Sequence, residues 1–408
     1  MVTNITTTMN KLTFCIPSKN NLRYLKNSIK SIKENSATEH DIVVFVDADN
    51  DGTEQWLIEN NIRYLLNETK EPMGIAYGYN RCIEAATTDI VCMFHADMYM
   101  AKGFDVGILK YLKPKVVVSG TRIEPPLHPQ GLEKIVENFG MYPEDFKKEL
   151  FNEYVSHLLE TNKDKTTAGI FAPWAVYKDE IVSMGMHDES FHSYHEDSDM
   201  FNRFILNGCE MLQTWEAYVY HLTCRGGQFQ DGIEKVTTDP QFHRMKNNAM
   251  RNYLRKWGSW IKNNEYQHPI IPHKYNIAFV ISNCNLQLLE ALEPWCDRIY
   301  VDERFAIGRA WDYVEAEQQN TNFDLKKRVL VRQNNDPVGE NDIVVGFDAT
   351  KLTDQNFQII QQLPQIINES GEPGVFELDI FRIHIYSTNT YESRYITNSD
   401  SYYTDRLI

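Results

Sequence analysis

The sequence has no apolar run approaching the ~20 residues that a helix needs to cross a bilayer. Its first residues, Met-Val-Thr-Asn-Ile-Thr-Thr-Thr, lack the basic and apolar regions of a signal peptide. The seven cysteines are scattered without paired spacing, which argues against a disulfide framework. Cys15, Cys82 and Cys92 stand in apolar contexts that are typical of small buried thiols in a reducing compartment. These absences predict a cytoplasmic protein with no transmembrane segment.

Positive charge is also in short supply, because 41 lysines and arginines face 57 acidic residues, for a net charge of -16. Proteins that bind nucleic acids or membrane surfaces in a general way neutralise many phosphates with basic residues, so the sequence predicts neither partner. One basic pocket for a small phosphorylated ligand remains compatible with this balance. The 408 residues, 42% of them hydrophobic and 24% charged, suit a globular protein of two or three domains.

Short apolar strands and amphipathic helices alternate along the first half of the chain. This order implies right-handed crossovers and a mostly parallel sheet, whose ligands gather at the carboxyl ends of its strands. The predicted strands are 12–20, 41–47, 62–66, 90–94, 116–119 and 215–220, with helices from Leu22 and from Gly74. Residues 133–159 are predicted to be largely helical, with a break at 141–143.

The strand at 90–94 ends abruptly in His95-Ala96-Asp97. His95 and Asp97 alternate around a small residue, so both side chains can approach one divalent cation, for which one or two protein carboxylates suffice. A solvated turn is the simpler alternative. The strand at 215–220 ends in His221, and Arg225 with the flexible Gly226-Gly227 pair follows it. This pattern favours a further metal ligand attached to a closing loop.

The acidic turn from Asp47 to Thr53 has three interpretations. A calcium loop would need a bidentate Glu at its twelfth position, where Ile58 stands. A phosphatase of the haloacid dehalogenase type would use Asp49 and Asp51, beyond the strand end. A turn that caps the following helix is compatible with a ligand at Asp47.

Glu196-Asp197 opens an amphipathic helix, where a carboxylate is stabilised by the helix dipole. The pair is therefore either a helix cap or the site of a general base that faces the crevice. The preceding His187, His192 and His195 do not have zinc spacing and favour a polar loop. Trp174, in an aromatic stretch at 169–177, is either core or a platform for a sugar ring.

Taken together, these pieces resemble a family 2 glycosyltransferase of the GT-A fold over roughly residues 11–230. The resemblance is carried by five motifs in order. They are the turn Pro17-Ser18-Lys19-Asn20; the strand-end acid Asp47; the helix start with Gly74, Ala76, Gly78, Asn80 and Arg81, where Tyr79 replaces an Arg; the metal motif His95-Ala96-Asp97; and Glu196-Asp197 with the late His221.

The resemblance implies a Rossmann-like, mostly parallel α/β sheet flanked by helices, and inverting transfer from a nucleotide-sugar, with a UDP-sugar favoured. It implies Mn2+ or Mg2+ at His95, Asp97 and His221; because imidazole binds magnesium poorly, His95 favours manganese. Asp197, paired with Glu196, would be the base. Asp47 would read the nucleobase, and the missing Arg would be compensated by Arg225, Arg81 or Lys19. The acceptor would be a glycan, a lipid-linked species or a protein.

The second half is predicted to be a helical linker at 233–272 and a smaller α/β domain at 273–408, after a catalytic domain at 1–232. Residues 276–281, 297–302 and 342–350 repeat the pattern of the first strands, so this domain looks like a degenerate GT-A-like repeat. Thr350 stands where Asp97 stood, which predicts a non-catalytic domain. It is expected to end in one alternating strand at 376–386, an edge that would favour a homodimer. Two rival hypotheses are the phosphatase and a non-catalytic carbohydrate-binding or assembly protein.

Overall fold

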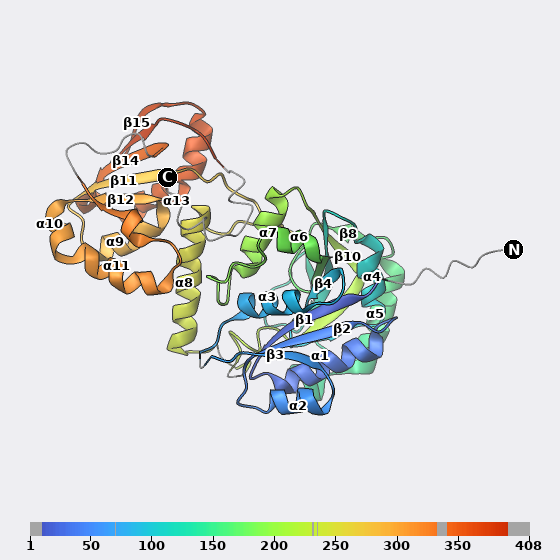
Figure 1. Cartoon of the computed structure of the whole chain (residues 1–408). Coiled ribbons are helices and arrows are strands. Elements are labelled where there is room, and N and C mark those ends of the chain that lie inside the picture. Colours follow the sequence, from blue (N-terminus) through green and yellow to red (C-terminus); the bar gives the residue numbers. More distant parts are fainter. Residues whose placement is uncertain (1–9, 70, 231, 235, 333–340, 391–408) are drawn as a thin grey trace. The chain divides into compact units, whose positions relative to one another are not determined.

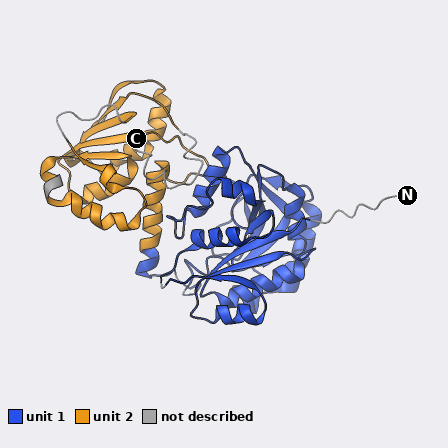
Figure 2. Cartoon of the chain, in the orientation of Figure 1, with its two compact units in different colours: residues 1–243, 263–269 blue, residues 244–262, 270–408 orange. Residues whose placement is uncertain are grey.

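The computed structural model describes residues 10–69, 71–230, 232–234, 236–332 and 341–390. The chain divides into two compact units, which Figure 2 distinguishes by colour. Unit 1 comprises residues 1–243 and 263–269, and unit 2 comprises 244–262 and 270–408. The segment 233–272, predicted as a separate linker, is thus shared between the units, and the predicted domain boundaries stay a proposal.

Unit 1 is built on one large mixed sheet with the strand order β3-β2-β1-β4-β9-β6-β10-β5 (Figure 1). The first four strands in this order are parallel, β9 and β5 are antiparallel to their neighbours, and β7 and β8 pair at the side. The strands are β1 (Leu12–Lys19), β2 (Asp41–Ala48), β3 (Arg63–Leu66), β4 (Ile90–Met93), β5 (Met98–Met100), β6 (Val116–Glu124), β7 (Lys134–Val136), β8 (Thr166–Thr167), β9 (Trp174–Tyr177) and β10 (Glu210–His221).

Helices flank this sheet, as an alternating order of strands and amphipathic helices requires. They are α1 (Leu22–Asn35), α2 (Thr53–Glu59), α3 (Ile75–Ala85), α4 (Phe104–Tyr111), α5 (Lys148–Thr161), α6 (Lys178–Ser183) and α7 (Glu196–Leu206). Helix α1 buries Leu25, Ile29 and Ile32 along one face. Helix α3 packs closely because Gly78 lies where a Cβ would come within 2.9 Å of Phe45 and Pro17. The predicted α/β class and mostly parallel sheet are confirmed.

Unit 2 has a six-stranded sheet in the order β13-β12-β11-β14-β16-β15. Its strands are β11 (Ile277–Ser282), β12 (Arg298–Val301), β13 (Val329–Val331), β14 (Ile343–Asp348), β15 (Gly374–Leu378) and β16 (Phe381–Ile385). Its helices are α9 (Leu286–Leu292), α10 (Glu303–Phe305), α11 (Trp311–Glu317), α12 (Leu325–Arg328) and α13 (Asp354–Ser370), together with α8 (Pro240–Trp257) from Arg244 on.

Two predictions of secondary structure were wrong. Residues 133–159 are helical only from Lys148, because residues 134–136 pair with β6 as β7. The predicted strand at 376–386 is a hairpin of β15 and β16, because Asp379 turns the chain with a φ of +51°. No helix in the described part of the chain is both long and apolar enough to span a membrane.

Candidate active site

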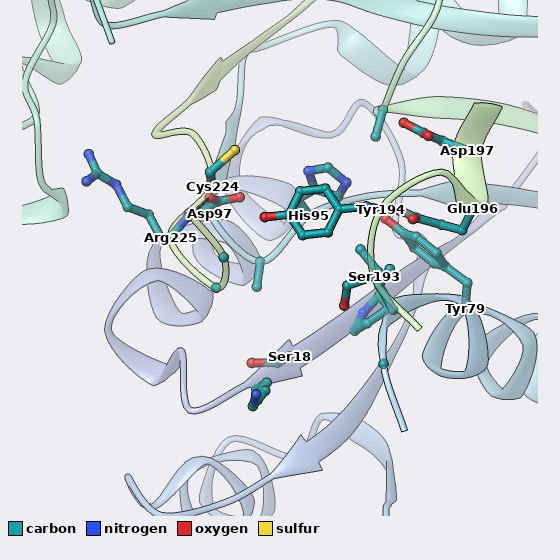
Figure 3. A pocket seen from close by; sticks show the side chains of 18 of the residues that line it. Ser18, Tyr79, His95, Asp97, Ser193, Tyr194, Glu196, Asp197, Cys224 and Arg225 are labelled. Carbon is teal, nitrogen blue, oxygen red and sulfur yellow. Dashed lines mark hydrogen bonds between the residues drawn. The ribbon is translucent and has the colours of Figure 1, made fainter. Parts of the chain in front are cut away.

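The carboxyl ends of β1, β2, β4 and β10 meet around a cavity of about 430 Å³ in unit 1. Figure 3 shows Tyr79, Glu196 and Asp197 on one side of it, Asp97, Cys224 and Arg225 on the other, and Tyr194 between them in this view. Its lining includes Pro17, Ser18, Lys19, Asp47, Gly74, Tyr79, His95, Ala96, Asp97, Arg122, Phe171, Trp174, His187, Tyr194, Glu196, Asp197, His221, Arg225 and the Gly226–Gly227 pair. Most of the side chains that the sequence analysis selected therefore share one cavity.

His95, Asp97 and His221 lie together at the ends of β4 and β10. Each offers one ligand atom, and these atoms lie within 4.8 Å of one another. Antiparallel pairing of β5 with β10 sets His221 opposite Met98, and the Leu222 amide donates to the Asp97 carbonyl at 3.0 Å. His221 Nε2 is 3.4 Å from Asp97 Oδ1 and 3.5 Å from His95 Nδ1. Two imidazoles and a carboxylate fit a divalent transition ion such as Mn2+ better than Mg2+.

Glu124, at the end of β6, was missed by the sequence analysis. Parallel pairing sets Tyr220 beside Ile123, so Glu124 adjoins His221. The Nδ1 of His221 donates to Glu124 Oε1 at 2.9 Å, and Lys134 Nζ donates to Oε2 at 2.8 Å. Arg122 is a further partner at 3.1 Å. A proton held at Nδ1 leaves Nε2 as the ligand atom toward Asp97 and His95, the arrangement of carboxylate–histidine pairs in metal sites.

The cluster has strongly perturbed ionisation in the absence of a cation. Burial, followed by the charge of His221, lowers the pKa of His95 to about 4. Burial also opposes charge on His221, but Asp97 and Glu124 outweigh it and raise its pKa to about 9. Burial opposes charge on Asp97 as well, yet His221, His95 and the Arg225 amide hold its pKa well below the usual range. The site is built for a net positive charge between these groups.

Arg225 follows His221 on the loop that borders the cavity. Its backbone amide donates to Asp97 Oδ2 at 3.1 Å, and its Nη2 donates to the Met141 carbonyl at 2.5 Å. The rings of Tyr24 and Tyr142 lie 5.8 and 5.2 Å from the guanidinium carbon. Nε and Nη1 are buried and have no hydrogen-bond partner. Two free donors beside the metal ligands suit an anionic group such as a diphosphate.

Glu196 and Asp197 occupy the first turn of α7, after His195 in a left-handed conformation with φ of +71°. The Asp197 carboxylate accepts from the Ser198 amide at 2.6 Å. Asp199, by contrast, is fully buried and pairs with Arg203 at 2.9 Å, so it faces away from the cavity. The structure therefore presents Glu196 and Asp197 to the cavity and withholds Asp199.

The two acids differ in how strongly the protein opposes their charge. Burial, and then Asp197, raises the pKa of Glu196 well above its ordinary value. Burial also raises the pKa of Asp197, but the Ser198 amide and hydroxyl and the charge of Arg122 counteract it. A pair of acids whose environments differ in this way divides one proton unequally. The proton resides on Glu196, which leaves Asp197 as the ionised member.

Asp47 lies at the end of β2 and lines the cavity, 6% exposed. Its carboxylate accepts from the amides of Met73 and Gly74, at 2.7 and 2.9 Å, and from Asn67 Nδ2 at 3.0 Å. It therefore fixes the loop before α3, whichever ligand it also meets. Gly74 is required here because a Cβ would lie 2.1 Å from the His192 carbonyl oxygen, which accepts from the Ile75 amide.

Three predicted donor-binding residues lie outside the lining of the cavity. Asn20 accepts from the Asn50 amide in a turn. Asn80 is buried and bonds to the backbone of His187 in both directions, and Arg81 pairs with Glu84. Trp174 lines the cavity but packs edge-on against Phe201 and Phe204. The sequence pattern of a helix start identified the segment without showing which of its side chains face inward.

The alternative motifs serve local structure. Asp49 accepts from the amides of Thr53 and Glu54, and Asp51 from the Leu22 amide and the Thr53 hydroxyl. Neither acid lines the cavity. His187 stacks on Tyr79, and His192 meets the Met73 carbonyl. Within the described residues, His95, Asp97 and His221 are the only group of three with metal-ligand geometry.

Comparison with known proteins locates a family match in unit 1. Residues 13–182 match the model described as glycosyl transferase family 2. A crystal structure of GalNAc-T7 with UDP, GalNAc and Mn2+ is similar at TM-score 0.44 and 11% identity, over 64% of this chain and 49% of that chain. The chain thus spans about half the length of GalNAc-T7.

S. aureus TarS 1–349 is similar at TM-score 0.38 and 11% identity, over 60% of this chain and 80% of that chain. Its complex with UDP gives the same score and identity, with 72% of that chain covered. A search of curated protein sequences gave no significant match.

Proposed function

Because residues 13–182 belong to glycosyl transferase family 2, we propose that the chain transfers a sugar from a nucleotide-sugar to an acceptor hydroxyl with inversion. The observation that carries this proposal is the meeting of two groups in one cavity. One is the set of metal ligands His95, Asp97 and His221, and the other is the carboxylate of Asp197 at a helix start. A leaving diphosphate needs the first group, and an attacking hydroxyl needs the second.

The donor's diphosphate is assigned to the His95, Asp97 and His221 side of the cavity. Mn2+ or Mg2+, when bound, would act as a Lewis acid on the diphosphate oxygens. Arg225 would donate Nε and Nη1, its two partnerless donors, to the same oxygens. The Gly226–Gly227 pair, whose open surroundings tolerate movement, would allow this loop to adjust around the donor. UDP-sugars are the first donors to test.

Asp197 is assigned as the general base. It would accept the proton of the acceptor hydroxyl, so that the oxygen attacks the anomeric carbon from the face opposite the diphosphate. The proton held by Glu196 keeps the neighbouring carboxylate available for this role. The acceptor is proposed to be a glycan, a lipid-linked species or a protein, and unit 2 is proposed to be non-catalytic.

The test is a hydrolysis and transfer screen with UDP- and GDP-sugars, in Mn2+ and in EDTA. A transferase releases nucleoside diphosphate slowly without acceptor, and the release stops in EDTA. Release of inorganic phosphate would instead indicate a phosphatase, and neither product would indicate a binding protein. NMR of the anomeric signal of the product gives the stereochemistry; retained configuration would overturn the direct-displacement mechanism.

A further inference from the structure

Buried polar atoms without partners concentrate around the cavity. Thirteen buried side-chain nitrogen and oxygen atoms of the described residues have no hydrogen-bond partner, and six of them belong to residues that line the cavity. Two of these are the guanidinium nitrogens of Arg225. The others are Ser18 Oγ, Tyr79 Oη, His187 Nδ1 and Glu196 Oε2. Since an unpaired buried polar atom costs about 1–3 kcal/mol, such a concentration marks a place where a ligand completes the bonds.

Tyr79 and Glu196 form the part of this set that is farthest from Arg225 in Figure 3. Tyr79 leaves helix α3 with only 4% of its surface exposed, and its ring stacks on the His187 imidazole with centroids 5.2 Å apart. The ring is therefore held rigidly while its hydroxyl stays unpaired. Glu196, from the start of α7, lies close enough to raise the pKa of the Tyr79 phenol, after the larger effect of burial. The phenol consequently remains protonated and able to donate.

The chemistry of this pair favours a neutral ligand group that both accepts and donates. A hydroxyl group can accept from Tyr79 and donate to Glu196 Oε2, which satisfies both orphaned atoms at once. A carboxylate can only accept, and it would face Glu196 and the ionised Asp197.

The cations of the lining do not offset this repulsion. Arg225 lies beside Asp97, and Arg122 is paired with Glu124 and Glu133. Lys19 follows Ser18 on β1, so its side chain leaves from the opposite face of the strand.

We propose that Tyr79 and Glu196 bind a hydroxyl of the donor's sugar ring, and that the site therefore selects neutral sugars over uronic acids. This inference rests on the proposed function, because it takes the ligand of the cavity to be a nucleotide-sugar. Ser18, whose hydroxyl is 4% exposed as a residue and equally unpaired, supplies a further bond at the end of β1. The selectivity is set by Tyr79, a position at which the phenol offers a hydrogen bond without a charge.

The experiment measures binding by calorimetry with Mn2+ present. The probes are UDP, four neutral UDP-sugars (glucose, galactose, N-acetylglucosamine and N-acetylgalactosamine) and two uronic acids (UDP-glucuronate and UDP-galacturonate). At least one neutral sugar should bind more tightly than UDP, and both uronic acids should bind no more tightly than UDP. Tyr79→Phe should weaken that neutral sugar about three- to tenfold and leave UDP unchanged, which is the effect of one lost neutral hydrogen bond.

Tyr77→Phe is the matched control, because Tyr77 lies on the same helix but not in the lining of the cavity. It should leave every affinity unchanged. Tyr79→Phe removes a hydroxyl that has no partner, so the fold is retained and thermal unfolding should confirm it. Tighter binding of a uronic acid, no gain from any sugar over UDP, or equal sugar affinity in Tyr79→Phe would overturn the inference while the proposed function stands. Failure of the wild type to bind UDP would overturn the proposed function itself.

Discussion

The two units share a sheet order and differ at the ends of its strands. The run β3-β2-β1-β4-β9 of unit 1 has a counterpart in β13-β12-β11-β14-β16 of unit 2, with β9 and β16 both antiparallel to the strand before them. Equivalent aromatic pairs pack edge-on within them, Phe14 with Phe94 at 5.5 Å and Phe279 with Phe347 at 5.8 Å. The same packing therefore supports two different sets of strand ends.

Those strand ends carry different chemistry. In unit 1, β4 is followed by the metal ligands, whereas β14 ends in Asp348 and continues into Ala349 and Thr350. Asn283, with a φ of +57°, donates its amide to Asp302 at 2.6 Å and its Nδ2 to Asp348 at 3.1 Å. The acids of unit 2 thus satisfy the chain itself. Function follows the side chains that a fold presents rather than the fold.

Buried charge shows the same contrast. In unit 2, Glu293 is fully buried between Arg255, whose Nη2 donates at 2.7 Å, and Arg328, whose Nε donates at 2.6 Å. Burial opposes the charge of Glu293, but these two cations hold its pKa well below the usual range. In unit 1 the charges converge on a cavity and leave bonds unmade. One cluster stabilises a fold, and the other is open to a ligand.

The largest effect is expected from exchanging equivalent acids of the two units for amides. Asp97→Asn should abolish nearly all sugar transfer, by ~10³-fold or more, because a neutral amide cannot balance a divalent cation that stabilises the leaving group by several kcal/mol. Asp348→Asn should leave transfer unchanged. Nucleoside diphosphate release in Mn2+ measures both, and full activity in Asp97→Asn would refute the metal site.

A nearly equal loss is expected at the helix that has no counterpart in unit 2. Asp197→Asn should lower turnover ~10²–10⁴-fold, the usual contribution of general-base catalysis. Affinity for UDP should stay constant, because this carboxylate meets the acceptor. Asp199→Asn is not a suitable control, since Asp199 pairs with buried Arg203. Asp179→Asn, on the neighbouring α6, is suitable because Asp179 lies outside the lining of the cavity. A variant at Asp197 as fast as wild type would leave it only a helix cap.

The stabilising cluster of unit 2 should respond in the opposite way. Glu293→Gln should lower the free energy of unfolding by ~3–5 kcal/mol, because it leaves Arg255 and Arg328 buried without a compensating charge. Chemical denaturation measures this. Glu34→Gln, which removes a half-exposed partner of Lys148, should cost at most ~1 kcal/mol. Equal costs in the two variants would show that Glu293 contributes little.

The sequence revealed the parts of the site that depend on one segment. An apolar run that stops at polar residues located Asp47, His95, Asp97 and His221, since strand ends meet at one edge of a parallel sheet. It did not reveal Glu124, which lies within a single run from Val116 to Glu124 and acquires its meaning from the pairing of β6 with β10. Pairing also decided that residues 134–136 form a strand. Local patterns cannot report contacts between distant segments.

The smallest effect, and the sharpest test of the missed residue, concerns Glu124. Glu124→Gln should weaken Mn2+ binding 10–100-fold, the usual effect of removing a partner of a metal-binding histidine. The amide keeps the shape of the side chain but offers one acceptor to two donors, the Nδ1 of His221 and the Nζ of Lys134. Titration by electron paramagnetic resonance measures the affinity without any substrate.

Glu133→Gln is the matched control for this loss. Glu133 belongs to the same buried network and lies 3.6 Å from Arg122, so the substitution removes an equal charge without removing a partner of His221. Its Mn2+ affinity should fall by less than about threefold, the size of a screened charge effect. Nitrogen NMR of the metal-free protein should show the Nδ1 proton of His221 in the control and its loss or exchange in Glu124→Gln. Equal Mn2+ affinities in the two variants would mean that Glu124 only neutralises Lys134 and Arg122, and that β10 alone orients His221.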